Sequence, residues 1–219
     1  GKEQSKTAEN GETGMDELTD LPALTLPDGL LLGSATAGHQ IEGDNRACQE
    51  WHQEMHDPRK AAEGRVPSGK ACDHWNRYRQ DVDLIADLGH QAYRYSIEWS
   101  RIEPEEGRRD DGAYAHYRDL TERLAARGIQ PWISVCHYTH PQWFEEKGGY
   151  NDEANIAWFE RHCAWLAERF GDLAAGWVLH NEFNGGGPAV ACRKINYLKA
   201  VARGAQAIRP FSKAPCTYA

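Results

Sequence analysis

Residues 178–184, VLHNEFN, carry the side chains in this sequence that are best suited to chemistry. An apolar run at residues 177–179 stops abruptly, and Asn181 and Glu182 follow it. Such a run predicts a short buried strand, so both polar side chains stand where a strand ends. A carboxylate with an amide beside it in that place is a candidate general acid. Acid catalysis by carboxylates often needs a second one, yet residues 183–219 contain neither Asp nor Glu.

A regular alternation of elements precedes and follows this segment. Short apolar runs predict buried strands at residues 31–36, 92–97, 131–136 and 176–180. Apolar residues that recur every three or four positions predict helices at residues 78–88, 114–124, 159–170 and 195–208. Residues 44–72 are predicted to be an irregular polar excursion. The pattern predicts an α/β fold with a parallel sheet, in which the ligand site lies at the carboxyl ends of the strands.

Polar side chains stand in or just after each predicted strand. They are His39, Gln40, Arg94, His137, Asn181 and Glu182. Because parallel strands end at one edge of a sheet, these side chains are expected to meet in one place. Four strand–helix units are half of an eight-stranded barrel, and an open doubly wound sheet is the alternative. The doubly wound alternative lacks a glycine-rich fingerprint after its first strand.

Composition limits the class of protein. The net charge of −8 argues against a nucleic-acid partner. No apolar run approaches the roughly 18 residues of a membrane span. The six cysteines form no C-x-x-C pair, which favours a reducing cytoplasm. Residues 1–20 are predicted to be a disordered polar tail, and residues 21–219 the folded part.

Five segments around the polar strand ends occur in a recognisable order. The segments are GHQIEG at residues 38–43, YRYSIEWSRIEP at 93–104, HYTHPQW at 137–143, GGY at 148–150 and NE at 181–182. In this order they resemble glycoside hydrolase family 1, the β-glucosidase and β-galactosidase family, from about residue 26 to about residue 209. The resemblance implies a TIM (β/α)8 barrel, of which this chain carries about the first four βα units. It also implies retaining hydrolysis of β-glycosides, without a metal or organic cofactor.

The resemblance also implies roles for single residues. Glu182 matches the general acid/base, and Asn181 matches the amide that holds the sugar 2-hydroxyl. His137 and Gln40 match side chains that bind sugar hydroxyls, and Arg94 matches the arginine beside the nucleophile. A general acid must keep its proton near neutral pH, so the Glu182 carboxyl is expected to be partly desolvated. Leu179 and Phe183 are expected to supply its apolar surroundings.

Each of these residues also has a structural alternative. Arg94 could form a buried ion pair that holds the sheet together, and Glu182 could be a strand-end carboxylate with its hydrogen bonds satisfied. Gln40, His137 and Asn181 could bond to nearby loops.

Two departures from the family pattern concern the chemistry. Phe183 stands where the family usually has proline. The family's nucleophile is a glutamate in a T-E-N-G-like motif on strand seven, and no such motif follows Glu182. The similar TAENG at residues 7–11 has polar flanks that build no strand, so it is interpreted as a chance match. After Arg209 the family pattern does not continue.

These departures lead to three expectations about function. The complete enzyme is expected to hydrolyse β-glycosides, whereas this chain is expected to be an inactive N-terminal half. A half barrel would expose unpaired strand edges, so a complementary C-terminal half or self-association is the expected partner. The alternative is a non-catalytic sugar-binding protein or a vestigial half barrel.

Overall fold

The structure is a computed structural model that describes residues 25–64, 66–182 and 191–219. Contacts within the chain divide it into two compact units, Gly1–Leu30 and Leu31–Ala219. In the first unit the described residues form a turn, in which the Leu30 amide donates to the Pro27 carbonyl at 3.2 Å. The predicted disordered tail at residues 1–20 lies outside the described residues.

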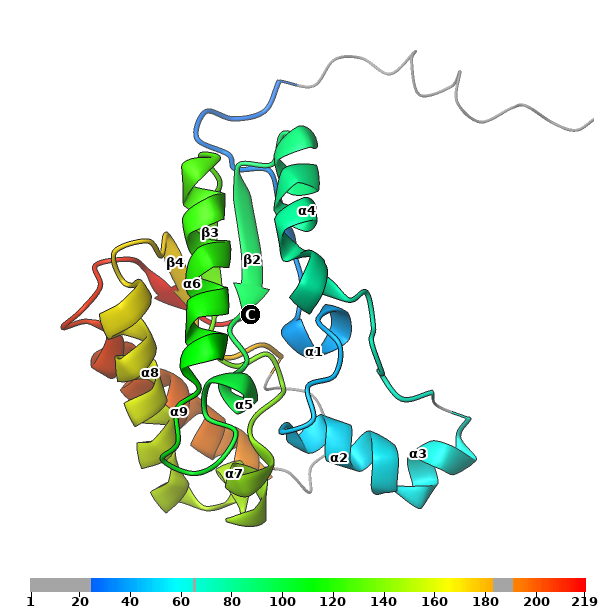
Figure 1. The fold of residues 1–219 in the computed structure, drawn as a ribbon. Helices are drawn as coiled ribbons and strands as arrows, with labels where there is room; N and C mark the ends of the chain where they lie inside the picture. The colour runs from blue at the N-terminus through cyan, green and yellow to red at the C-terminus, as the bar shows by residue number, and fades with distance from the viewer. Residues whose placement is uncertain (1–24, 65, 183–190) are drawn as a thin grey trace, which may run out of the picture. The chain divides into compact units, whose positions relative to one another are not determined.

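The second unit is built on one parallel sheet (Figure 1). Its strands are β1 (Gly33–Ala35), β2 (Ala92–Ser96), β3 (Gln130–Ser134), β4 (Gly176–Val178) and β5 (Cys216–Thr217). They lie side by side in sequence order, and each neighbouring pair is parallel. The first four are the strands that the sequence predicts.

A fifth strand, β5, lies after Arg209, where the sequence analysis predicts no element. Cys216 and Thr217 pair with Trp177 and Val178 of β4. The sequence signal was weak because β5 has two residues, and the sheet itself supplies its hydrogen-bonding partners. The Leu179 amide donates to the Thr217 carbonyl at 2.8 Å, for example.

A long helix follows each of the first four strands, as predicted. These helices are α4 (His74–Asp87), α6 (Asp111–Ala126), α8 (Ile156–Phe170) and α9 (Ala191–Ile208). In Figure 1, α4 and α6 flank β2, and α8 lies beside α9. The glycines that follow α4 and α6, Gly89 and Gly128, have φ angles of 69° and 73°, a left-handed conformation that suits glycine at a helix end.

Short helices occupy the connections at the carboxyl end of the sheet. They are α1 (Gly38–Ile41), α2 (Gln49–His56), α3 (Pro58–Ala62), α5 (Trp99–Ile102), α7 (Gln142–Glu146) and the 3₁₀ turns η2 (Gly149–Asn151) and η3 (Glu153–Asn155). The prediction that residues 44–72 are irregular was wrong, because α2 and α3 lie there. The helix α2 was not predicted because its sequence is mostly polar. It buries Gln49 and has no buried apolar stripe.

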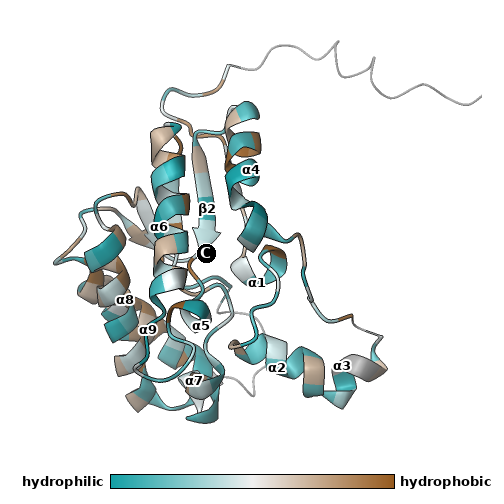
Figure 2. Cartoon of the chain, in the orientation of Figure 1, coloured by the Kyte–Doolittle hydropathy of each residue, from teal (hydrophilic) through white to brown (hydrophobic). Residues whose placement is uncertain are grey.

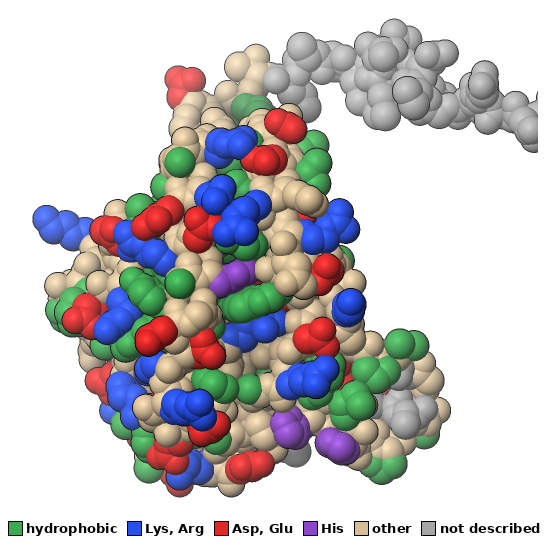
Figure 3. All heavy atoms as spheres, in the orientation of Figure 1, with side chains coloured by type: hydrophobic (Ala, Val, Ile, Leu, Met, Phe, Trp, Pro, Cys, Tyr) green, Lys and Arg blue, Asp and Glu red, His purple; other side chains and the backbone are tan. Residues whose placement is uncertain are grey.

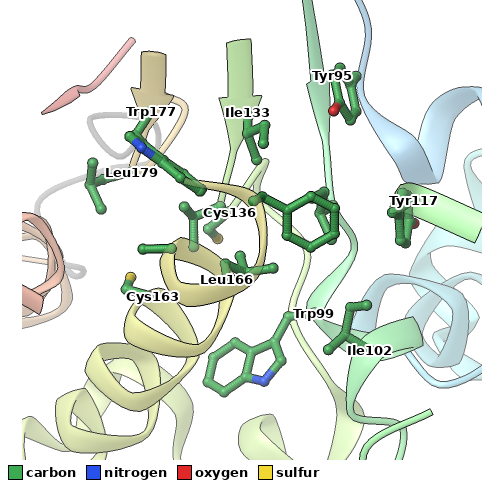
Figure 4. Packing of buried hydrophobic residues seen from close by; sticks show 14 of the residues in the cluster. Tyr95, Trp99, Ile102, Tyr117, Ile133, Cys136, Cys163, Leu166, Trp177 and Leu179 are labelled. Carbon is green, nitrogen blue, oxygen red and sulfur yellow. The ribbon is translucent and has the colours of Figure 1, made fainter. Parts of the chain in front are cut away.

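One hydrophobic core lies between the strands and the long helices. Figure 4 shows Ile133 and Trp177 pointing from the strands toward Leu166 and Cys163 of α8, with Trp99 and Ile102 nearby. These side chains are fully buried. The long helices are hydrophilic over much of their outer surface (Figure 2). This pattern matches helices that cover one face of a sheet.

The surface carries charges of both signs. Figure 3 shows Lys and Arg interspersed with Asp and Glu over the visible face, without a patch of one sign. In the described ranges no helix is long and apolar enough to span a membrane.

Candidate active site

The five residues that the family resemblance selects line one pocket, with a volume of about 460 Å³. His39, the other polar residue of the strand-end pattern, does not line it: its imidazole is buried and bonds to the Glu54 carboxylate at 3.1 Å. Its lining consists of Ala35, Thr36, Ala37, Gln40, Arg94, His137, Tyr138, Asn181 and Glu182. They come from four separate strand–loop connections that span residues 35–182. A pocket of this size at the carboxyl ends of parallel strands is typical of small-ligand sites.

The sheet and its first connection place two of these side chains. Gln40 is exposed on α1, which begins three residues after β1. Arg94 lies within β2, where it pairs with Ala35 of β1 and Trp132 of β3. The neighbouring Tyr93 and Tyr95 are in the helix-covered core. Because successive side chains of a strand point to opposite faces of the sheet, Arg94 faces away from that core.

The end of β4 places Asn181 and Glu182. The Asn181 amide donates to the Cys136 carbonyl at 3.0 Å, and the Glu182 amide donates to the Ala219 carbonyl at 2.6 Å. Glu182 has a φ of 51°, in the left-handed region that non-glycine residues rarely adopt. The segment that contains β5 therefore fixes the backbone of Glu182. Strained residues of this kind are concentrated at functional sites.

Arg94 and Asn181 hold each other within the pocket. The Arg94 guanidinium donates from Nη1 to Asn181 Oδ1 at 3.2 Å, which turns the amide oxygen toward Arg94. Within the described part of the chain Arg94 has no carboxylate partner, so the alternative of a buried ion pair finds no support there. Among the described residues its buried Nε atom has no hydrogen-bonding partner.

His137 is a neutral imidazole in the same pocket. Burial, and secondarily the positive charge of Arg94, lowers the pKa of His137 to about 4. Its buried Nδ1 atom has no hydrogen-bonding partner in the part of the chain that the structure describes. Since an unpaired buried polar atom is costly, the free Nδ1 points to a ligand or water that completes it. Asn181 is only 6% exposed, and His137 is buried as well. Both side chains therefore present polar groups to the pocket from largely buried positions.

The Glu182 side chain differs from the expectation of partial desolvation. It is exposed, and in the described ranges no side chain bonds to its carboxylate. Leu179, which was expected to shield it, is fully buried in the core instead, because β4 turns it toward the helices. Phe183, the other expected neighbour, lies outside the described residues.

Glu182 is the only carboxylate among the described residues that line the pocket. Three other glutamates, Glu42, Glu98 and Glu103, are buried and do not line the pocket. Glu98 accepts hydrogen bonds from Ser96, Asn45 and Thr139, at 2.8, 3.1 and 2.7 Å. The Glu98 carboxylate thus accepts three hydrogen bonds and lies outside the pocket lining. These are the features of a structural group rather than of a nucleophile.

Glu42 is similarly committed to internal partners. It accepts from Tyr117 at 2.8 Å and from Arg101 at 2.6 Å. The TAENG segment at residues 7–11 lies outside the described residues. Among the described residues that line the pocket, none supplies a second carboxylate.

Sequence reasoning missed four lining residues, Ala35, Thr36, Ala37 and Tyr138, of which Thr36 and Tyr138 carry polar side chains. Tyr138 follows His137 with a φ of 55°, which no local sequence signal predicts for a tyrosine. Trp143 lies outside the pocket lining and donates from its indole to the Glu103 carbonyl at 2.9 Å, a structural role. Over the described ranges, no three potential ligands are grouped around a metal position.

Comparison with known proteins now adds to this geometry. The family model of Glycosyl hydrolase family 1 matches residues 23–189. The chain belongs to this family. Beta-glucosidase A of Thermotoga maritima is 37% identical over 165 residues, covering 71% of this chain and 36% of that protein. Aryl-phospho-beta-D-glucosidase BglC of Bacillus subtilis is 35% identical, covering 73% of this chain and 35% of the relative.

Solved structures of the family share the fold. The apo structure of beta-glucosidase 1317 matches with a TM-score of 0.81 and 30% identity, covering 87% of this chain and 56% of the other. The family 1 β-glucosidase from Thermotoga maritima matches with a TM-score of 0.77 and 31% identity, covering 87% and 48%. The predicted fold class is confirmed as part of a (β/α)8 barrel. The chain spans about a third of the length of the curated relatives that it matches.

Proposed function

We propose that this chain provides the acid/base wall and much of the sugar-binding surface of a retaining β-glycosidase of the β-glucosidase type. One observation carries the proposal. Five residues that match site positions of the family, 142 positions apart at the extremes (182 − 40), line a single pocket. A structural role for each of them separately would not require this convergence.

In the proposed reaction Glu182 protonates the oxygen of the leaving group and then, as a carboxylate, activates water. Its exposed position, with no partner in the described part of the chain, leaves it available to a glycosidic oxygen. Asn181, His137 and Gln40 bind sugar hydroxyls. The low pKa of His137 supports this role, because a neutral imidazole both donates and accepts hydrogen bonds at neutral pH.

Arg94 is proposed to stabilise the attacking carboxylate. Its guanidinium reaches into the pocket, and its Nε atom is buried without a partner. A positive charge without a counterion suits a site where a second carboxylate must stay ionised. A retaining mechanism places that carboxylate about 5 Å from Glu182.

We propose that a complementary segment, corresponding to the C-terminal half of the family's barrel, supplies this second carboxylate. The absence of another carboxylate from the described pocket lining motivates this proposal. The described chain by itself is therefore expected to bind β-glycosides without hydrolysing them. Association with a complementary half, or self-association, is the expected partnership.

The first test uses the chain by itself. Methyl β-D-glucoside should shift the NMR signals of His137 and Asn181, with weaker shifts in Gln40→Ala. A folded sample that shows no shifts at 100-fold molar excess or more would contradict the proposed sugar site. The resemblance to both glucosidases and phospho-glucosidases makes methyl 6-phospho-β-D-glucoside the natural second probe.

The second test joins this chain to the C-terminal half of Beta-glucosidase A. Hydrolysis of cellobiose should appear in the fusion and fall at least about 100-fold in Glu182→Gln, as expected for loss of a general acid. Hydrolysis of 2,4-dinitrophenyl β-glucoside should fall less in its first step, because that leaving group needs no protonation. Equal losses for both substrates in that step would exclude the acid role.

A sugar-binding protein without catalysis is the second candidate. The lone carboxylate in the described pocket lining favours it. Sugar binding by the chain, together with an inactive but correctly folded fusion, would support this candidate instead.

The cysteine pattern bears on the compartment. The five described cysteines, Cys48, Cys72, Cys136, Cys163 and Cys216, are all free thiols. We propose a reducing cytoplasm, where such thiols persist. Thiol alkylation of the protein in intact cells would test this assignment.

A further inference from the structure

The chain reversal after β3 determines where His137 points. β3 ends at Ser134, and the next polar group that faces the pocket is His137. Tyr138 then takes a left-handed conformation, with a φ of 55°. A tyrosine rarely adopts this conformation without support, because its Cβ crowds the following carbonyl. The reversal at residues 137–140 therefore needs contacts that hold it.

Gln49, the first residue of α2, makes those contacts. Its side-chain Nε2 donates to the Tyr138 carbonyl at 3.1 Å, and its Oε1 accepts from the His140 amide at 2.7 Å. Its own backbone amide donates to the His140 carbonyl at 3.0 Å. Gln49 is only 5% exposed, so water does not compete effectively for these three bonds.

The surrounding contacts extend this support without replacing it. Cys48 and Pro141 form an antiparallel bridge, which brings the start of α2 alongside the reversal. Thr139 donates from its hydroxyl to Glu98 at 2.7 Å. That bond fixes a side chain, whereas Gln49 binds the backbone on both sides of Thr139.

We propose that Gln49 is a positioning residue, which holds the reversal at residues 137–140 so that the His137 imidazole faces the pocket. Gln49 itself lies outside the pocket lining and so acts through His137. The importance of His137 for sugar rests on the proposed function, but the positioning of its ring does not.

The chemistry of the side chain makes the proposal specific. A carboxamide can donate to one carbonyl and accept from one amide at the same time. A glutamate at position 49 could still accept from His140 but would set a carboxylate against the Tyr138 carbonyl. A methionine has a similar length and makes neither bond. The two variants should therefore impair the reversal by different routes.

The test measures the ionisation of His137 in the chain as it exists. In the unmodified chain, burial and Arg94 keep the pKa of His137 low, at about 4. NMR titration of the imidazole should show this value rising by about one unit or more in Gln49→Met, toward the unperturbed value of about 6.5. Gln49→Glu should also shift it. Gln53→Met, at an exposed position one turn later on the same helix, is the matched control and should leave it unchanged.

Different results separate the two proposals. An unchanged pKa of His137 in a folded Gln49→Met or Gln49→Glu variant would overturn the positioning role. If both variants fail to fold, amide exchange in the unmodified chain decides. The His140 amide should then be strongly protected, and exchange as fast as in an unstructured peptide would overturn the role. Failure of methyl β-D-glucoside to bind the unmodified chain would refute the sugar site alone.

Discussion

The buried carboxylate of Glu42 allows a prediction whose sign differs from ordinary acid denaturation. Glu42 is 3% exposed, and burial is the largest influence on its ionisation. Its pKa is raised from the usual 4.5 to about 7, although Arg101 lies at 2.6 Å and favours the charged form. Desolvation therefore outweighs the ion pair.

The sign of the effect on stability follows from proton binding. Between pH 4.5 and about pH 7 the folded state binds more protons at Glu42 than the unfolded state does. The contribution of Glu42 to the free energy of unfolding is thus fully present below pH 4.5 and is lost as the pH rises through about 7. At about 1.36 kcal/mol per pKa unit, the loss amounts to about 3 kcal/mol.

Glu42→Gln isolates this contribution. The amide oxygen can still accept from Tyr117 and Arg101, but it does not ionise. The free energy of unfolding in urea should be measured from pH 5 to pH 8 for both proteins by tryptophan fluorescence. The original chain should lose up to about 3 kcal/mol relative to Glu42→Gln over that range.

A matched control removes one charge from the surface. Glu105 is 66% exposed at its side chain, so Glu105→Gln should change the free energy of unfolding little over the same pH range. A flat difference between the original chain and Glu42→Gln would refute the reasoning. A difference that grows only below pH 4.5 would show that the ion pair with Arg101 outweighs desolvation.

Three further predictions concern packing, buried charge and acid stability. Gly204→Ala should lower the free energy of unfolding by about 1–3 kcal/mol, because the added Cβ would lie 2.9 Å from Cys163 Sγ and 3.0 Å from the Phe159 ring. Urea unfolding at pH 7 checks this, and an unchanged midpoint of the urea transition would contradict it. Glu103→Ala should cost about 3–5 kcal/mol, since this fully buried carboxylate binds Arg161 at 2.6 Å and accepts from the Trp99 indole at 2.9 Å; thermal unfolding checks it, and a loss below about 1 kcal/mol, the value of a surface pair, would count against it. The low pKa of His137 should lower the free energy of unfolding by up to about 3 kcal/mol as the pH falls from 6.5 to about 4, because the unfolded state takes up the proton first. His137→Asn should lack this part of the pH dependence. Equal slopes of the free energy of unfolding against pH for both proteins would refute the prediction.

Much of the fold could be predicted because its signals are local. Tyr78, Val82 and Ile85 recur at helical spacing, and all three are buried on α4. The apolar run before Asn181 forms β4, whose three residues are all buried. Such periodicities depend on neighbours within a few residues, so a linear pattern suffices to read them. The weak signals failed where tertiary contacts supply the stability, as for β5 and α2.

The types of the site residues could also be predicted, but their surroundings could not. Glu182, Asn181, His137, Arg94 and Gln40 were selected from strand-end positions and the family resemblance, and they line one pocket. The exposure of the Glu182 side chain was not predicted. It depends on which neighbouring side chains lie against it, and the expected neighbour Leu179 packs into the core instead.

The sequence by itself determined the order of the first four strands and the long helices that follow them, the family, and the side chains available for chemistry. The tertiary structure alone decided how these side chains meet and what holds them. Arg94 and Asn181 are 87 positions apart in the chain, and Gln49 and His140 are 91 apart. Hydrogen bonds over such separations form only after the sheet has brought distant strand ends together, so no local pattern encodes them. The same holds for the pKa of Glu42 and His137, which depends on burial by residues from several elements rather than on residue type.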